Sequence, residues 1–142
     1  MDSYDTARER MVQEQIIRRG ITSPRLLTAL RQVPRHYFVS PEMREHAYAD
    51  GPLPIQMGQT ISQPYIVALM TDLLQLNGGE TVLEIGTGSG YQAAILSLLA
   101  ARVLTIERHT VLAEQARSML DKLGCTNVQV LVSDGSLGWP PA

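Results

Sequence analysis

The sequence is poor in several features that define particular classes of protein. Cys125 is its single cysteine, so no internal disulfide can form, and a secreted framework of disulfides is excluded. No apolar run approaches the roughly 18–20 residues that are needed to cross a bilayer. The formal net charge is only −2, and the basic residues are scattered, with Lys122 the single lysine. The chain therefore lacks a strong field with which to hold nucleic acid or an anionic membrane.

What is present fits an ordinary soluble domain. The chain has 142 residues, of which 44% are hydrophobic and 18% charged. The first twenty residues are polar and charged, unlike the apolar centre of a signal peptide, so a cytoplasmic location is expected. His36, His46 and Cys125 have no partners at metal-ligand spacing, so we predict no metal site.

Helical signals dominate the first half of the chain. Tyr4 to Arg19 is predicted as a helix that stops at Gly20. Ser23 and Pro24 start a second helix, which Pro34 ends, and residues 34–58 are predicted to be irregular. The segment Ser62-Gln63-Pro64 starts a third helix. Its buried stripe is expected to consist of Ile66, Leu69, Met70, Leu73 and Leu74.

Strands and helices alternate in the second half. Short buried strands are predicted at residues 82–85, 103–106 and 128–132, with helices over 91–99 and 110–123 between them. This alternation is typical of a parallel sheet with crossover helices, an α/β fold. Right-handed crossovers would place the strands in the spatial order third, second, first.

A glycine loop follows the first predicted strand. Its sequence, Glu84-Ile85-Gly86-Thr87-Gly88-Ser89-Gly90, allows a sharp turn and a close approach of the backbone to a ligand. A dinucleotide fingerprint would need its third glycine at Tyr91, and no Gly-Lys-Ser/Thr ending indicates a phosphate loop. Glu84 before the first glycine suits a cationic amino-acid group better than a pyrophosphate. An acidic residue followed by glycines at alternate positions is the pattern of S-adenosylmethionine-dependent methyltransferases; the alternative is a tight turn without a ligand.

Acidic residues also end the other two predicted strands. Glu107 lies about 20 residues past the loop, where a carboxylate can accept hydrogen bonds from both ribose hydroxyls of a nucleoside. Asp134 can accept from an adenine amino group, and Gly135 permits close approach. Taken singly, Glu107 is more typical of a solvated strand end, and Asp134-Gly135 is a common turn pair. Together the three acidic ends favour a ligand site at the carboxyl rim of the sheet.

With these residues the chain resembles the protein-L-isoaspartate O-methyltransferases over almost its whole length. The glycine loop is common to many methyltransferases, whereas the block from Gly58 to Pro64 is far more specific to this family. The matching blocks are Arg19-Gly20-Ile21, Val33-Pro34-Arg35-His36 with Phe38-Val39, Ala47-Tyr48-Ala49-Asp50, Gly58-Gln59-Thr60-Ile61-Ser62-Gln63-Pro64, Val82 to Gln92, and Asp134-Gly135-Ser136 with Gly138-Trp139.

The resemblance implies a Rossmann-like methyltransferase fold, the cofactor S-adenosyl-L-methionine and a protein-repair reaction. The substrate would be the free α-carboxyl of an L-isoaspartyl residue, with Ser62 as the key catalytic hydroxyl and the segment from Gln59 closing over the cofactor. A plain N-cap is the alternative role for Ser62. The implied cofactor-binding residues are Gln59, Thr60, Glu84, Gly86, Thr87, Gly88, Gly90, Glu107, Arg108, Asp134 and Gly135.

The resemblance also implies an organisation in two parts within one structural domain. Residues 1–62 would form a helical and irregular extension that carries the substrate and cofactor loop, and residues 63–142 a partial Rossmann-like cofactor-binding domain. Family members continue with further strands, so the parallel sheet is expected to be truncated after its third strand. The first strand would then have an open edge, which invites self-association.

Three other functions compete with isoaspartyl repair. The chain could bind S-adenosylmethionine without transferring a methyl group, or it could methylate another substrate, such as RNA or a small molecule. The lack of a basic patch argues against RNA. A nicotinamide-dependent oxidoreductase is a more distant alternative, which Tyr91 at the third-glycine position disfavours.

Overall fold

The N-terminal segment forms one continuous helical rod. In the computed structural model, which describes residues 2–140, helix α1 spans Ser3–Met11 and continues through a π-helical turn at Val12–Ile16 and a 3-10 turn at Ile17–Arg19. Gly20 ends it with a φ of 97°, in the left-handed region that glycine adopts without strain. The predicted helix from Tyr4 to Arg19 and its stop are confirmed.

The segment between residues 23 and 61 is more regular than its sequence predicts. Helix α2 spans Pro24–Gln32, with Ser23 at the N-cap position but without a side-chain cap. Two 3-10 helices follow at Arg35–Phe38 and Pro41–His46. Strand β1 (Leu53–Pro54) then pairs antiparallel with β2 (Thr60–Ile61), and this hairpin leads directly into the next helix.

The buried face of helix α3, Pro64–Leu74, differs from the predicted one. The residues that face the core are Pro64, Val67, Ala68 and Thr71, whereas Met70, Leu73 and Leu74 are at least half exposed. Thr71 can be buried because its hydroxyl donates to the Val67 carbonyl at 2.8 Å. Of the predicted stripe, Leu69 packs against the core, but the other four residues are exposed. Nearly every position of this helix is apolar, so hydrophobic spacing does not single out one face.

The second half forms the predicted parallel sheet. Strands β3 (Thr81–Ile85), β4 (Arg102–Glu107) and β5 (Val128–Val132) lie in the order β3-β4-β5, with α4 (Tyr91–Ser97) and α5 (Thr110–Lys122) as the crossovers. Ile85 pairs with Ile106, and Glu107 pairs with Val132. The carboxyl ends of all three strands therefore meet at one edge. The Rossmann-like fold with an N-terminal helical extension is confirmed.

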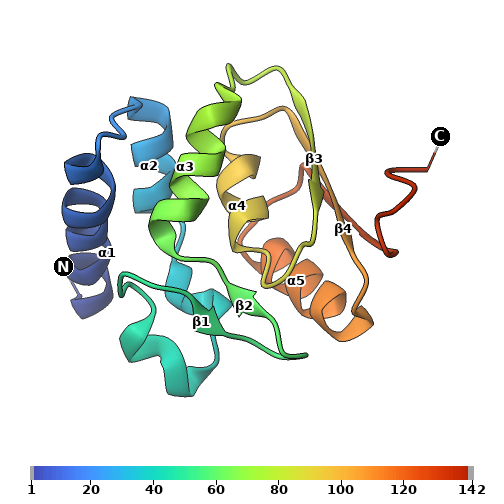
Figure 1. The fold of residues 1–142 in the computed structure, drawn as a ribbon, viewed down its shortest axis with the longest axis horizontal. Coiled ribbons are helices and arrows are strands. Elements are labelled where there is room, and N and C mark those ends of the chain that lie inside the picture. The colour runs from blue at the N-terminus through green and yellow to red at the C-terminus, as the bar shows by residue number, and fades with distance from the viewer. Residues whose placement is uncertain (1, 141–142) are drawn as a thin grey trace.

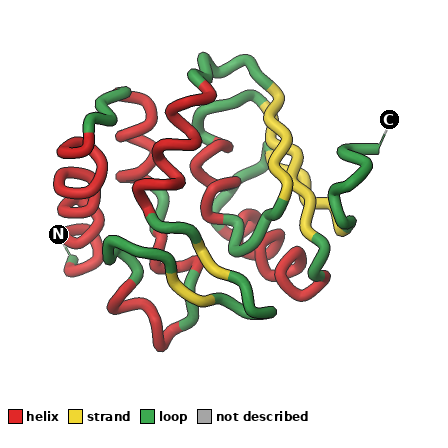
Figure 2. The backbone as a smooth tube through the Cα atoms, in the orientation of Figure 1, coloured by secondary structure: helices red, strands yellow, loops and turns green. Residues whose placement is uncertain are grey.

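The helices gather on one side of this sheet. Figure 1 shows α4 next to the strands, α3 and α2 beyond it and α1 outermost, while the chain after β5 lies on the opposite side. Figure 2 shows the same separation, with the parallel strands set apart from the helices. One hydrophobic cluster joins the two parts, because it includes Met11, Leu30 and Phe38 as well as Ala94 and Val103.

Candidate functional site

The glycine loop wraps around the end of the neighbouring strand. Gly86 and Gly88 have φ values of 91° and 56°, which side-chain-bearing residues rarely adopt. The backbone N–H groups of Gly86 and Thr87 donate to the Ile106 carbonyl at 2.7 and 3.1 Å. A Cβ at Gly86 would meet no atom within 4 Å, so the space in front of this glycine is open. The loop thus exposes its backbone at the carboxyl edge of the sheet.

Gly90 has a different role from the other loop glycines. It occupies the N-cap position of α4 with a φ of 94°, and a Cβ there would lie 3.2 Å from the Ala116 Cβ. Close packing between the loop and α5 therefore requires a glycine here. Gly90 does not line the cavities that surround the predicted cofactor residues.

Glu107 connects the end of β4 to the glycine loop. Its side chain is buried, and its two carboxylate oxygens accept hydrogen bonds from the Gly88 and His109 N–H groups, both at 2.9 Å. A carboxylate offers about four lone-pair sites, so further hydroxyl donors can still be accepted. The loop and the predicted ribose-binding group therefore hold each other in place.

Glu84 is a carboxyl group with a perturbed charge. The Thr105 hydroxyl donates to its Oε1 at 2.6 Å, and the Thr105 and Thr87 hydroxyls are themselves 2.6 Å apart. Burial raises the pKa of Glu84 to about 7, with a smaller contribution from the nearby Glu107, while the Thr105 hydrogen bond acts in the opposite direction. A cationic ligand group beside Glu84 would restore its ionised form.

Two adjacent cavities collect most of the predicted residues. One, of about 390 Å³, is lined by residues that include Gln59, Gly86, Glu107, Arg108 and Asp134. The other, of about 70 Å³, is lined by residues that include Thr60, Ser62, Glu84 and residues 86–88. Gly86 lines both, so the two cavities are adjacent, and between them they bring the hairpin, the glycine loop and the ends of β4 and β5 together.

Asp134 and Gly135 form a turn that lies across the end of the sheet. Asp134 Oδ1 accepts from the Ser136 N–H and hydroxyl, each at 2.8 Å, and these bonds lower the pKa of Asp134. Gly135 has a φ of 79°, and a Cβ there would lie 2.9 Å from Ile85 Cγ2. The glycine contributes close packing beside the 390 Å³ cavity, while Asp134 lines that cavity.

Residues far from the glycine loop hold the hairpin that carries Ser62. Asp50 forms an ion pair with Arg19 and accepts from the Gln63 Nε2 at 2.7 Å. These contacts lower the pKa of Asp50 to about 2. The Arg19 guanidinium also lies over the Tyr65 ring, 5.3 Å from its centroid. Sequence reasoning assigned Asp50 and Arg19 no role, although both fall in blocks that carry the family resemblance.

Arg35 is another residue whose role the sequence did not reveal. Its Nε donates to the Ala47 carbonyl at 2.6 Å, and its Nη2 donates to the Ser62 carbonyl at 2.9 Å. The only signal in the sequence was its place in the block Val33-Pro34-Arg35-His36. His36, in contrast, stacks on the Tyr4 ring and contacts the Tyr48 hydroxyl within the N-terminal packing.

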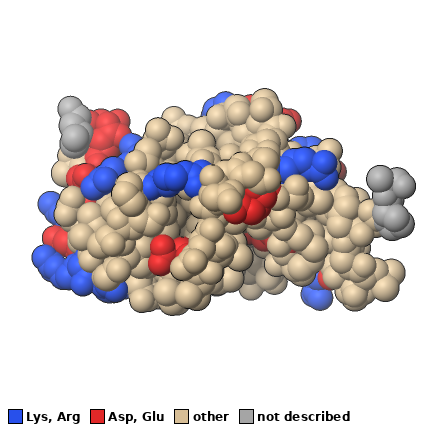
Figure 3. All heavy atoms as spheres, turned by 90° about the horizontal axis from the view of Figure 1, so that it is seen from above, with Lys and Arg blue, Asp and Glu red and all other residues tan. Residues whose placement is uncertain are grey.

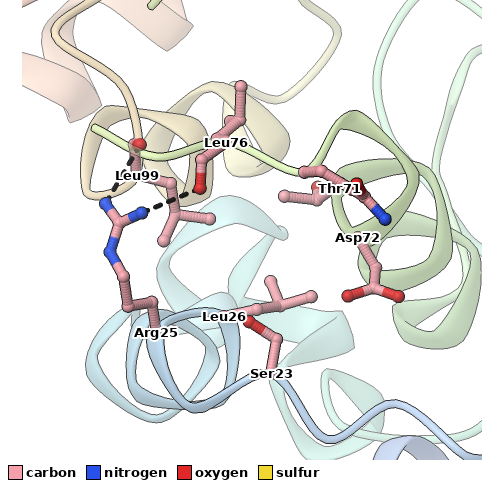
Figure 4. Close-up of a pocket in the computed structure, with 8 residues that line it drawn as sticks. Ser23, Arg25, Leu26, Thr71, Asp72, Leu76 and Leu99 are labelled. Atoms are coloured by element: carbon pink, nitrogen blue, oxygen red, sulfur yellow. Dashed lines mark hydrogen bonds between the residues drawn. The ribbon is translucent and has the colours of Figure 1, made fainter. Parts of the chain in front are cut away.

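Two other cavities have different linings, although the larger one shares Gly88 and Ser89 with the 70 Å³ cavity. A cleft of about 850 Å³ on the α5 side of the glycine loop has mostly apolar walls, including Phe38, Met43 and Met119. A smaller cleft lies between α2, α3 and α4, where Arg25 donates to the Leu76 and Leu99 carbonyls at 2.9 and 3.1 Å (Figure 4). Arg25 thus joins the ends of two helices to a third. Neither cleft collects a carboxylate cluster like that of the glycine-loop site.

Residues 2–140 contain neither a membrane-spanning helix nor a metal-ligand cluster. No helix in this range is long and apolar enough to span a bilayer. Within the same range, no group of three or more His, Cys, Asp and Glu side chains is arranged to hold a metal ion. On the face shown in Figure 3, basic and acidic side chains are interspersed.

Comparisons with known proteins agree with the geometry. The chain is 64% identical over 140 residues to a protein-L-isoaspartate O-methyltransferase of Trichlorobacter lovleyi. The match covers 99% of the chain and 64% of the relative. A solved protein-L-isoaspartate O-methyltransferase superimposes with a TM-score of 0.81 at 30% identity, covering 94% of the chain and 44% of the other protein. The chain thus spans about two thirds of the length of the curated relative.

A second solved structure shares the fold at lower identity. It is a protein-L-isoaspartate O-methyltransferase of Plasmodium falciparum in complex with S-adenosyl-L-homocysteine, with a TM-score of 0.70 at 22% identity, covering 93% of the chain and 63% of that protein. The sequence model of the family described as protein-L-isoaspartate(D-aspartate) O-methyltransferase matches residues 6–142. The chain therefore belongs to the protein-L-isoaspartate(D-aspartate) O-methyltransferase family.

Proposed function

We propose that this chain binds S-adenosyl-L-methionine and serves the transfer of its methyl group to the free α-carboxyl of L-isoaspartyl residues in damaged proteins. One observation carries the proposal. Thr60 and Ser62, from the family-specific hairpin, line the same small cavity as Glu84 and the glycine loop. A cofactor loop and a substrate loop thus meet at one point.

The residues around the two cavities suit this cofactor. S-adenosylmethionine carries an ammonium group, a sulfonium centre and two ribose hydroxyls, and it supplies an activated methyl group when bound. Glu84 would pair with the ammonium group and Glu107 would accept from the ribose hydroxyls, while Asp134 would accept from the adenine amino group. Gly86, Thr87 and Gly88 would approach the cofactor closely, and Gln59, Thr60 and Arg108 would border it.

The chemistry demands alignment more than acid–base catalysis. A substrate carboxyl with an ordinary pKa near ~3.5–4 is ionised at neutral pH, so no general base is needed to make it a nucleophile. The Ser62 hydroxyl would orient this carboxylate by hydrogen bonding, and the hairpin would exclude water around it. Orientation of this kind is a major source of rate enhancement in bimolecular reactions.

Methyl transfer to a defined peptide pair tests the proposal. Labelled S-adenosylmethionine is supplied with an isoaspartyl peptide and, as the matched control, with its normal aspartyl twin. We expect label on the isoaspartyl peptide alone. Label on neither peptide, with the cofactor still bound, would favour a cofactor-binding module without turnover. Label on both peptides, or on RNA or a small molecule instead, would point to a different substrate.

The partners follow from the same proposal. Proteins that contain isoaspartyl residues would be the substrates, in the cytoplasm, without a need for nucleic acid or a membrane surface. We further propose that a second copy of the chain pairs with the outer edge of β3. Within residues 2–140 that edge has no partner strand, and Leu83 and Ile85 on β3 are 44% and 56% exposed.

A further inference from the structure

A buried cation lies directly behind the proposed substrate loop. The Arg35 side chain is 0% exposed, and no carboxylate within residues 2–140 lies at ion-pair distance from it. Burial lowers the pKa of Arg35, although an arginine keeps its charge over the range in which proteins are studied. Buried charges are usually paired, because removing an ion from water is costly. This unpaired guanidinium therefore calls for an explanation.

The partners of Arg35 converge on Ser62. Its Nη2 donates to the Ser62 carbonyl at 2.9 Å, and its Nε donates to the Ala47 carbonyl at 2.6 Å. The Arg35 side chain thereby links Ser62, the residue before the N-cap of α3, to Ala47 at the end of the 3-10 helix Pro41–His46. Hydrogen bonds from a charged donor are shorter and stronger than neutral ones, so this contact fixes the Ser62 backbone firmly.

The remaining face of the guanidinium meets Tyr91 without being neutralised. The Arg35 Cζ lies 4.8 Å from the centroid of the Tyr91 ring. Burial raises the pKa of Tyr91 to about 12, so its phenol stays neutral at physiological pH. Both Arg35 Nη1 and the Tyr91 hydroxyl are buried without a hydrogen-bond partner. Ser62 and Tyr91 both line the 70 Å³ cavity, so the positive charge lies immediately behind its wall.

We infer that Arg35 is a positioning residue for the substrate carboxylate. It holds the Ser62 backbone in place, and its uncompensated charge gives the cavity a positive potential at the point where an anionic substrate group must bind. Glu84 lines the same cavity and Glu107 lines the adjacent one, and these carboxyl groups suit a cationic cofactor. The charge part of this inference rests on the proposed function, whereas the part about the Ser62 backbone does not.

The experiment compares two arginines that each donate to two backbone carbonyls. Arg35→Met removes the donors and the charge, Arg35→Lys keeps the charge with a different geometry, and Arg25→Met is the matched control in the distant cleft of Figure 4. Four quantities are measured in the 142-residue chain: amide hydrogen exchange over residues 59–63, affinity for S-adenosyl-L-homocysteine, and kcat and KM for the isoaspartyl peptide. Unfolding curves identify a temperature at which all variants are folded.

Arg35→Met should accelerate exchange over residues 59–63 by about tenfold or more, because a hydrogen bond of about 1.4 kcal/mol is lost. Peptide KM should rise about tenfold or more, with S-adenosyl-L-homocysteine affinity changed by less than about twofold. Arg35→Lys should bring the peptide KM part of the way back to that of the unaltered chain. Arg25→Met should leave all four quantities near those of the unaltered chain.

Several results would overturn the inference or one of its two parts. Unaltered exchange over residues 59–63 in Arg35→Met would show that Arg35 does not hold the Ser62 backbone. Equal losses of peptide and cofactor affinity, or the same losses in Arg25→Met, would reduce Arg35 to a general packing role. If Arg35→Lys raised the peptide KM as much as Arg35→Met does, the electrostatic part of the inference would be refuted. If the unaltered chain methylates no peptide, the proposed function fails, yet the exchange comparison still decides whether Arg35 positions Ser62.

Discussion

At the scale of single residues, the structure distinguishes between the two roles that the sequence suggested for Ser62. The sequence left open whether it caps the following helix or serves the substrate. Gln63, not Ser62, occupies the N-cap position of α3, and no side-chain cap forms there. The Ser62 side chain therefore does not cap α3, and Ser62 lines the cavity with Glu84.

Replacement of Ser62 tests the remaining interpretation. We expect Ser62→Ala to lower kcat/KM for the isoaspartyl peptide by about 10- to 100-fold, the range for a hydrogen bond to a charged group. Affinity for S-adenosyl-L-homocysteine and the unfolding free energy should change little, since no cap is lost. Ser118→Ala on the exposed face of α5 is the control. If Ser62→Ala lowered the unfolding free energy by as much as it raised the activation free energy for the peptide, the assignment would be contradicted.

Glu84 gives the site a dependence on pH. Its pKa in the folded chain is about 7, above the ordinary value of 4.5, so the folded state binds more protons than the unfolded state between these pH values. The stability that this group contributes is fully present below pH 4.5 and is lost as pH rises through 7. A cationic cofactor group would favour the ionised form, so cofactor affinity should rise with pH over the same window.

Ligand-free thermal unfolding and cofactor titration from pH 5 to pH 8.5 check this pH dependence. The unfolding midpoint of the unaltered chain should fall and cofactor affinity should rise, by up to about tenfold per pH unit below the pKa of Glu84. Glu84→Gln should flatten both curves. Glu80→Gln is a suitable control, because backbone N–H groups lower the pKa of Glu80, the opposite of the shift at Glu84. A pH dependence that persists in Glu84→Gln would assign it to another group.

At the scale of secondary-structure elements, the sequence predicted which helices and strands form and how they are ordered better than it predicted which face of a helix is buried. The crossover helices and the three strands follow from alternating apolar runs and glycine punctuation, and the strand order follows from handedness. The buried face of α3 did not follow, because its residues are almost all apolar. Nor did the roles of Arg35 and Asp50, whose partners lie more than ten residues away and leave no periodic signal.

The two faces of α3 can be distinguished by stability. We expect Met70→Ala and Leu73→Ala to change the unfolding free energy by less than about 0.5 kcal/mol, as for other exposed positions. Ala68→Leu should cost about 1–3 kcal/mol, because Ala68 is fully buried and a larger side chain in a packed core strains its neighbours. Urea unfolding at fixed protein concentration gives the values. Losses of 2–5 kcal/mol at Met70 and Leu73 would restore the predicted stripe.

At the scale of the whole molecule, the two outer strands of the sheet differ in their protection. On β5, the Arg117 side chain donates to the Val130 carbonyl at 2.8 Å and so guards part of that edge. On β3, Leu83 and Ile85 present exposed apolar side chains beside an edge without a partner strand in residues 2–140. Unprotected strand edges are templates for pairing with another chain. A second copy should therefore associate through β3 rather than β5.

Sedimentation velocity over a range of protein concentrations tests this association. The unaltered chain should shift from monomer to dimer as concentration rises, and Leu83→Lys should shift it back, because a charge on an edge strand opposes pairing. Val111→Lys on α5 is the matched control, since Val111 is 45% exposed and Leu83 is 44% exposed. If both lysine variants dissociate the dimer equally, added charge rather than the β3 edge explains the effect. A chain that stays monomeric at every concentration would refute pairing through β3.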